Sequence, residues 1–349
     1  MDKEDTKFPG LFKLCKALDF ELGYSFNVYD VVYFIRHVSI AVGCKNNCSH
    51  CFSNAPISIS QTSLQGFARI IKEIGEIVAI NNNSLPFFHL GASNDPAFVK
   101  NYYSYLLEWR KAMPSFQQIK VFSHGWNLRN DIQVEEFQKY LSVLEQYSNI
   151  KAVISFDSFS KLARANWDIY IQNISQNLNY FISSIGRERI RIEVFYTPER
   201  LSCNPKYTLE YWRELILKGN CLSIQDIIEE IDGCNENNDC AKVTCGLLKV
   251  FHLCGLKATD LINMSRDCES IFPAGRGKQF FNNLAQDNYQ KGLEIQKKRV
   301  LYSLKDYIHK YMGVIILPDG TCQTVNYHGY KAGKILNHGQ PIIQYMSLI

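Results

Sequence analysis

The feature that most limits the fold of this chain is a repeated alternation of short apolar runs with longer amphipathic stretches, which begins near residue 37. The apolar runs have the length of strands, and the stretches between them carry apolar residues at helical spacing. This alternation favours right-handed βαβ units around a parallel sheet, and hence an α/β fold whose sheet forms a closed or partial barrel. The pattern predicts strands at 37–43, 86–91, 118–123, 150–157 and 189–196, and helices at 62–80, 97–112, 133–147, 165–185 and 207–218.

Three cysteines follow the first expected strand, at the end where α/β barrels carry their chemistry. Cys44, Cys48 and Cys51 have the spacing C-x3-C-x2-C, and the aromatic Phe52 comes immediately after them. A cubane iron–sulfur cluster is normally held by four thiolates, so three local thiolates leave one iron open. An open metal position is typical of a catalytic site rather than a structural one. Two alternatives remain: a zinc site with a distant fourth ligand, and three cysteines that are merely buried.

The composition limits the class of protein and its partners. With 349 residues, 46% hydrophobic and 21% charged, the chain has the make-up of an ordinary globular protein. The net charge of +4 comes without a basic block, so a nucleic-acid partner is not indicated. No signal peptide or membrane-length apolar run is present in the sequence, and we expect a cytoplasmic protein with no membrane partner. Its 12 cysteines should then be reduced, structural or metal-bound.

The cysteine spacing, the aromatic residue after it and its place behind the first strand together resemble the radical S-adenosylmethionine (SAM) superfamily. The resemblance implies a partial (β/α)6, TIM-like barrel and a 4Fe–4S cluster held by Cys44, Cys48 and Cys51. It also implies that SAM binds the fourth iron and is split by one electron into methionine and a 5′-deoxyadenosyl radical. That radical abstracts a hydrogen from the substrate, and an electron donor such as flavodoxin or ferredoxin reduces the cluster.

Matches to the same superfamily continue over residues 37–200, mainly at strand ends. The family's Gly-Gly-Glu-like motif for the SAM amino group is replaced by "LGASNDP", in which Asn94 or Asp95 substitutes for the Glu. The third strand ends in "SHGW", the fourth in "ISFDS" near the expected ribose, and the fifth in "FYTPER". A later turn, "IFPAGRGKQF", offers Arg276 to a carboxylate. The resemblance therefore implies a cofactor site formed by Phe52, Gly91, Ala92, Ser93, Asn94, Ser123, His124, Ser155, Asp157, Glu199 and Arg276.

Several of these residues have a structural alternative. His124 fits a histidine satisfied by its neighbours at a strand end, and Asp157 fits a purely structural carboxylate equally well. Asp95 precedes Pro96 and fits the N-cap of the next helix. Arg276 fits a plain surface turn.

Outside the expected barrel of residues 37–290, we expect a helical N-terminal cap at 1–36 and a C-terminal appendage at 291–349. The appendage resembles a reduced SPASM or Twitch region that lacks the full cysteine set. Its segment "GVIILPDGTCQTVNYHG" predicts two strands joined at "PDG". The polar segment 231–245 predicts a loop or insertion.

A second metal site would change the expected reaction type. Cys234, Cys240, Cys245 and Cys254 are four thiols close in sequence, which suits a cluster or zinc. Their irregular spacing and partly apolar surroundings favour buried cysteines, and we expect no second metal there. The substrate radical would then be quenched by a thiol, for which Cys268 and Cys322 are the candidates.

We therefore expect a radical SAM enzyme that acts on a ribosomally made peptide. The short segment before residue 37 leaves little room for a peptide-binding winged-helix element. This favours the alternative of a radical SAM enzyme acting on a sugar, aminoglycoside or nucleotide. A third possibility, from another class, is a non-catalytic iron–sulfur or zinc-binding protein.

Overall fold

The structure is a computed structural model, and it describes residues 7–22, 25–51, 55–81, 89–90, 94–113, 119–197, 203–220, 222–232, 238–267, 312–326 and 341–344. The strands are β1 (Ile35–Val38), β2 (Ala41–Val42), β3 (Ser60–Gln61), β4 (His89–Leu90), β5 (Ile119–Ser123), β6 (Ile150–Phe156), β7 (Ile190–Val194), β8 (Ser265–Asp267), β9 (Met312–Ile316), β10 (Thr321–Asn326) and β11 (Pro341–Gln344). The helices are α2 (Pro9–Leu22), α3 (Val28–Val31), α4 (Leu64–Asn81), α5 (Tyr102–Ala112), α6 (Asp131–Gln146), α7 (Lys161–Ala165), α8 (Trp167–Ile185), α9 (Leu209–Leu217), α10 (Ile224–Asp232), α11 (Asp239–Leu253) and α12 (Asp260–Met264). Short 3-10 turns lie at Val32–Phe34, Pro96–Phe98, Arg187–Arg189 and Pro205–Tyr207.

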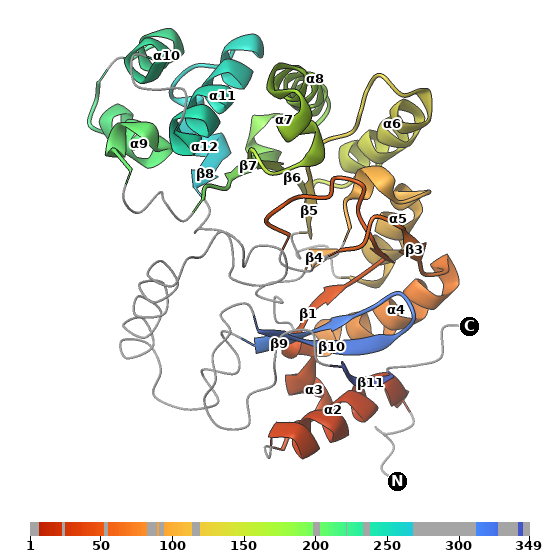
Figure 1. The fold of residues 1–349 in the computed structure, drawn as a ribbon. Helices are drawn as coiled ribbons and strands as arrows, with labels where there is room; N and C mark the ends of the chain where they lie inside the picture. The colour runs from red at the N-terminus through yellow and green to blue at the C-terminus, as the bar shows by residue number, and fades with distance from the viewer. Residues whose placement is uncertain are drawn as a thin grey trace.

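The main sheet has nine strands in the order β11-β10-β9-β1-β4-β5-β6-β7-β8. From β1 to β8 the neighbours in this list are parallel and follow the order of the chain, with helices between them (Figure 1). On the other side of β1, β9 is also parallel, whereas β10 and β11 are antiparallel additions. The α/β fold class is therefore confirmed, and the described strands form an open sheet rather than a closed barrel.

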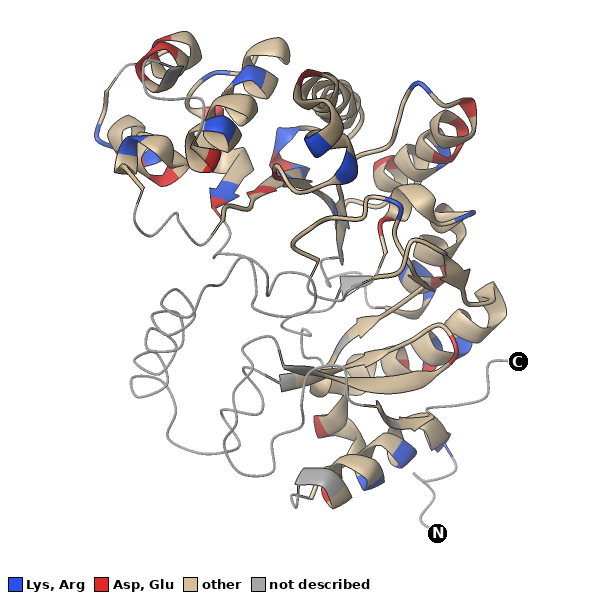
Figure 2. Ribbon diagram, in the orientation of Figure 1, with Lys and Arg blue, Asp and Glu red and all other residues tan. Residues whose placement is uncertain are grey.

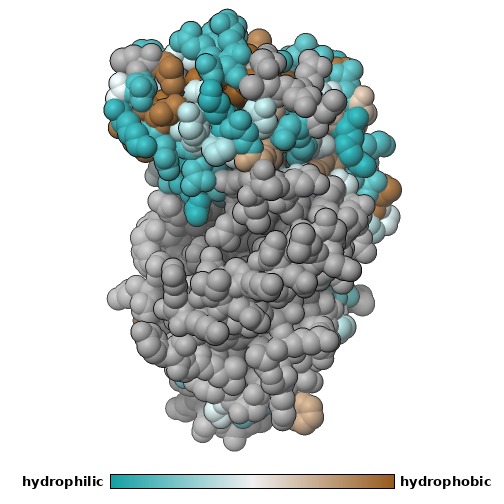
Figure 3. Space-filling view, turned by 60° about the vertical axis from the view of Figure 1, so that its left-hand side comes forward, coloured by the Kyte–Doolittle hydropathy of each residue, from teal (hydrophilic) through white to brown (hydrophobic). Residues whose placement is uncertain are grey.

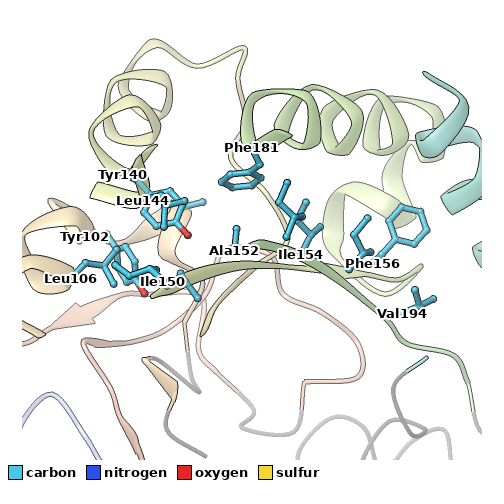
Figure 4. Packing of buried hydrophobic residues seen from close by; sticks show 14 of the residues in the cluster. Tyr102, Leu106, Tyr140, Leu144, Ile150, Ala152, Ile154, Phe156, Phe181 and Val194 are labelled. Atoms are coloured by element: carbon cyan, nitrogen blue, oxygen red, sulfur yellow. The ribbon is translucent and has the colours of Figure 1, made fainter. Parts of the chain in front are cut away.

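The helical side of the sheet holds the largest part of the core. Along β6, Ala152 and Ile154 point toward the helices, where Phe181 of α8 meets them (Figure 4). Tyr140 and Leu144 of α6 pack on the same side, and all of these side chains are buried. Alternate residues of a strand face opposite sides of a sheet, so Val153 and Ser155 face away from these helices. Helix α8 begins where the side chain of Asn166 accepts a hydrogen bond from the backbone N–H of Ile169.

Each of the five predicted strands overlaps a strand of the main sheet, but the first is shorter than expected. The chain leaves the main sheet after Val38, and β2 then pairs with β3 instead. The helix expected at 165–185 is confirmed as α8, which begins two residues later than expected, and the separate short helix α7 precedes it. The hairpin predicted around "PDG" is confirmed as β9 and β10, with Gly320 at a φ of 86°.

The loop expected at 231–245 is wrong over much of its length. Residues from Asp239 onward form α11, whose first turn is capped by the side chain of Asn238. The first residues of this helix are polar and resemble a loop in sequence, although the helix is buried along one side. Residues 233–237 lie outside the described ranges.

The surface of helices α9–α12 mixes both signs of charge (Figure 2). In the upper part of Figure 3 this region is mainly hydrophilic, with smaller hydrophobic areas. Leu217 and Leu253 are exposed hydrophobic side chains of α9 and α11. Over the described part of the chain, every helix is too short or too polar to cross a membrane.

Candidate metal and cofactor site

The three cysteines lie in the loop between β2 and β3, just beyond the carboxyl end of β1. Gly43 enters the loop with a φ of 114°, and a Cβ at that position would lie 2.0 Å from the carbonyl oxygen of Ser58. Only glycine fits this close approach without a shift of the backbone. The backbone N–H of Asn47 donates to the carbonyl of Cys44, and that of Cys51 to the carbonyl of Cys48. Two successive turns therefore carry the three thiols.

Backbone contacts tie this cysteine loop to the segment that follows β6. The N–H of Ser49 donates to the carbonyl of Phe159 at 3.1 Å, and the N–H of Lys161 donates to the carbonyl of Asn46 at 2.7 Å. The guanidinium of Arg164 donates to the carbonyl of Asn47 at 2.8 Å. These contacts fix a loop of little regular structure against the end of a central strand.

Cys44 and Cys48 lie in surroundings that favour the neutral form of their thiols. Burial raises the pKa of Cys44 to about 12, and the carboxylate of Asp95 adds to the rise. Burial also raises the pKa of Cys48, and the Asp157 carboxylate and the other two thiols add to it. Cys48 is only 7% exposed and packs with Phe159, with Cys51 and Phe195 beside them. A cation at this position would favour the thiolates, since a metal binds a thiol in its deprotonated form.

Asp95 joins the cysteine loop to the end of β5. Its carboxylate accepts hydrogen bonds from the Asn46 amide at 2.9 Å, the Ser123 hydroxyl at 2.8 Å and the His124 backbone N–H at 2.7 Å. It also accepts from the backbone N–H of Ala97, which is the N-cap contact that the sequence predicted. The cap is therefore confirmed, and it is one of four bonds to this carboxylate.

Asp157 lies at the centre of the site and is fully buried. Its Oδ1 accepts from the backbone N–H groups of Phe159 at 2.8 Å and Ser160 at 3.1 Å. Its Oδ2 lies 3.5 Å from Nδ1 of His124 and 3.9 Å from Nε2 of His50. These contacts are those of the structural alternative, and the predicted place of Asp157 near the ribose of SAM stays a prediction.

His50 is a site residue that the sequence analysis missed. Its ring lies between two aromatic rings, with centroids 4.7 Å from Phe159 and 5.9 Å from Phe195. Its position between Cys48 and Cys51 was a usable signal, because a side chain inside a metal-binding motif shares the surroundings of its ligands.

Two observations at this edge bear on whether a thiolate-bound cluster and a polar cofactor could bind there. The donor set is three thiols, which suit iron–sulfur clusters and zinc. The side-chain amide of Asn94 is buried, and both its nitrogen and its oxygen lack a hydrogen-bond partner among the described residues. A buried amide without partners is costly, so a polar ligand there would stabilise it. No three His, Cys, Asp or Glu side chains of the described ranges are gathered around a common point as the ligands of a single metal ion would be.

The structure brings several of the predicted site residues together, whereas others lie outside the described ranges. Cys44, Cys48, Cys51, Asn94, Ser123, His124 and Asp157 lie at one edge of the sheet, where β1, β4, β5 and β6 end. The hydroxyl of Ser123 donates a hydrogen bond to Asp95 and accepts one from the backbone N–H of Gly125. Ser155 lies half-buried in β6 beside Glu193. The predicted residues outside the described ranges are Phe52, Gly91, Ala92, Ser93, Glu199, Cys268 and Arg276.

Cys322 and the cysteines of α11 lie in the hydrophobic core. Cys322 is fully buried in β10, and burial raises the pKa of its thiol. The expected role of Cys322 as a hydrogen donor stays a prediction, and its thiol is enclosed among the described residues. Cys240 and Cys245 are buried in α11, and the Cys254 thiol donates to the carbonyl of Ser175 at 3.4 Å. Cys234 lies outside the described ranges.

Comparisons with known proteins leave the family of this chain open. No protein-family model matches the sequence, and a search of curated proteins finds no match. Among solved structures, the chain is similar to SuiB of Streptococcus suis, in a crystal structure described as bound to precursor peptide SuiA. The match has 15% sequence identity and a TM-score of 0.43, and it covers 91% of this chain and 71% of that one. At this TM-score it carries no argument about the fold or the function.

Proposed function

We propose that this protein is a radical SAM enzyme, with a 4Fe–4S cluster on Cys44, Cys48 and Cys51 and SAM at the carboxyl edge of a partial (β/α)6 barrel. The observation that carries the proposal is a loop with three thiols at the edge where the parallel strands end. Clusters take thiolate ligands, and three of them leave one iron for another molecule. Ligands of parallel α/β sheets bind at this same edge.

When bound, the cluster and SAM supply one-electron cleavage of SAM and hydrogen abstraction from a substrate. The chain itself contributes binding, orientation and exclusion of water. The three cysteines would bind iron, and the amide of Asn94, which has no hydrogen-bond partner among the described residues, would meet a polar group of SAM. Phe159 and Phe195 pack beside Cys48 and Cys51 and would help to exclude water from Cys48.

For the substrate we propose a ribosomally made peptide, with a flavodoxin or ferredoxin as electron donor and the cytoplasm as location. The C-terminal hairpin of β9 and β10, with Gly320 at its turn, supports this choice through its resemblance to a reduced SPASM-like region. A sugar, aminoglycoside or nucleotide is the alternative substrate. The same cysteine loop would hold either type of radical SAM chemistry.

Nucleophilic catalysis by a cysteine is a second candidate function, because Cys48, His124 and Asp157 lie in a row. This order is that of a cysteine nucleophile, its base and an orienting carboxylate. Nucleophilic cysteines are partly exposed and have a lowered pKa. Cys48 is 7% exposed and its pKa is raised by burial. Its surroundings therefore fit a metal ligand better than a catalytic nucleophile.

The first experiment asks whether the three thiols hold the cluster. Anaerobic reconstitution with iron and sulfide should give the visible charge-transfer absorbance of a cluster, and the triple variant Cys44→Ala, Cys48→Ala, Cys51→Ala should lose it. Cys254→Ala is the matched control, because its half-buried thiol is bonded to the carbonyl of Ser175, away from the loop. Unchanged iron and sulfide in the triple variant would show that the site is wrong.

The second experiment asks whether the cluster is catalytic. Dithionite and SAM added to the reconstituted protein should release 5′-deoxyadenosine, measured by chromatography. A cluster without this product would indicate a non-catalytic iron–sulfur protein. Zinc in place of iron in the purified protein would indicate a zinc-binding protein.

A further inference from the structure

The backbone of His124 is held in place at the end of β5. Its backbone N–H donates to Oδ2 of Asp95 at 2.7 Å. Gly125 follows with a φ of 91°, and a Cβ at that position would lie 3.3 Å from the side chains of Ile174 and Asn177. The chain therefore turns directly after His124, and the backbone of this residue has a fixed place at the end of β5.

The ring of His124 lies between a thiol and a carboxylate. Its Nε2 is 3.5 Å from Sγ of Cys48, and its Nδ1 is 3.5 Å from Oδ2 of Asp157. Asp157 cannot turn away, because its Oδ1 accepts two backbone N–H groups in the turn after β6. The ring therefore has Nε2 facing Cys48, and its other nitrogen lies beside a carboxylate whose place is fixed.

We propose that His124 is a positioning residue for Cys48. Its Nε2 donates a hydrogen bond to the ligating thiolate of Cys48, and this bond raises the reduction potential of the cluster. The inference rests on the proposed function, in which Cys48 holds iron. A ligating thiolate only accepts hydrogen bonds, so a ring nitrogen at this distance faces it with an N–H. Hydrogen bonds to cluster sulfurs are among the factors that set the reduction potential of a cluster.

The physical reason is the charge of the reduced cluster. Reduction adds an electron that is shared with the sulfur ligands, and an N–H donor stabilises the added negative charge. Cys48 is nearly enclosed, so bulk water replaces this donor poorly. Removal of the donor should therefore make reduction harder.

The test compares two variants of similar volume that differ in the donor. His124→Met removes the N–H, whereas His124→Gln places an uncharged amide N–H near the position of Nε2. Both are reconstituted, their iron content is measured, and the midpoint potential is determined by a redox titration followed by electron paramagnetic resonance. We expect a more negative potential in His124→Met and a return toward the wild-type value in His124→Gln. Retention of the cluster by His124→Gln alone would also support the role.

Equal potentials in the wild type and both variants, at equal iron content, would overturn the inference. Loss of the cluster from both variants with unchanged melting temperatures would overturn it as well, because the donor would not then be what the site requires. These failures appear in the variants only. A failure of the proposed function appears in the wild type, as a chain that assembles no cluster.

The contact itself is measurable in the metal-free protein. In a long-range proton–nitrogen spectrum of histidine-labelled protein, Cys48→Ala should shift the Nε2 resonance of His124, which His124→Gln identifies by its absence. Cys254→Ala is the control and should leave it in place. An Nε2 resonance whose chemical shift is the same with and without the Cys48 thiol would count against the contact.

Discussion

At the scale of single residues, Asp95 shows how much of the site depends on one carboxylate. It is 3% exposed and accepts four hydrogen bonds, from Asn46, Ala97, Ser123 and His124. These donors belong to the cysteine loop, to the turn after β4 and to the end of β5. The sequence predicted only the local bond to Ala97, because two residues separate cap and donor. The other bonds span 28 to 49 residues and leave no local pattern.

Replacing Asp95 tests whether this hub holds the site together. Asp95→Ala leaves several buried donors without an acceptor, and we expect the free energy of unfolding to fall by about 3 kcal/mol. Asp95→Asn keeps one of the two oxygens and should cost less. Urea unfolding measures both, with the exposed Glu145→Ala on α6 as a control that should stay within about 0.5 kcal/mol of the wild type. If the free energy of unfolding falls no further in Asp95→Ala than in the control, the hydrogen bonds to the Asp95 carboxylate contribute nothing to stability.

At the scale of elements, the sequence predicted best where the periodic signal is strong. The strands β5, β6 and β7 follow from runs of apolar residues, and α4 and α6 follow from apolar residues at helical spacing. β8 was not predicted, because its three residues include two charged ones and show no period. α11 was missed because Asn, Asp and Cys in its first turn are typical of loops as well as of capped helix starts. For the site, the spacing of Cys44, Cys48 and Cys51 located the loop, but the partners of His124 come from other strands.

The cysteines of α11 allow a test of whether a second cluster exists. Cys240 and Cys245 are buried in a helix rather than carried by a loop, so we expect them to bind no metal. Reconstituted protein should hold about four irons per chain, the content of one cubane. The double variant Cys240→Ala, Cys245→Ala should keep that content. A value near eight that falls to four in this variant would instead show an auxiliary cluster, and would turn the proposed chemistry toward net oxidation.

At the scale of the whole molecule, the two ends of the described chain meet in one sheet. β9, from near the C-terminus, lies parallel to β1, which leads into the cysteine loop. Val38 is in register with Ile316, and the N–H of Ser39 donates to the carbonyl of Ile316 at 2.8 Å. The hairpin of β9 and β10 is therefore bonded to the strand that positions the site (Figure 1).

This pairing predicts that the C-terminal hairpin unfolds together with the α/β sheet. Ile316 is fully buried, and Ile316→Ala should lower the free energy of unfolding by about 2–5 kcal/mol. The 4 tryptophans all precede residue 213, so their fluorescence follows the α/β part, while circular dichroism follows the whole chain. We expect both signals to shift by the same amount in urea, because loss of β9 exposes an edge of β1. Ile132→Ala, at a side chain that is 75% exposed, is the control and should change neither signal. A fluorescence midpoint that stays in place while circular dichroism shows a separate early transition would mean that the hairpin is an independent unit, and that the cysteine loop does not need it.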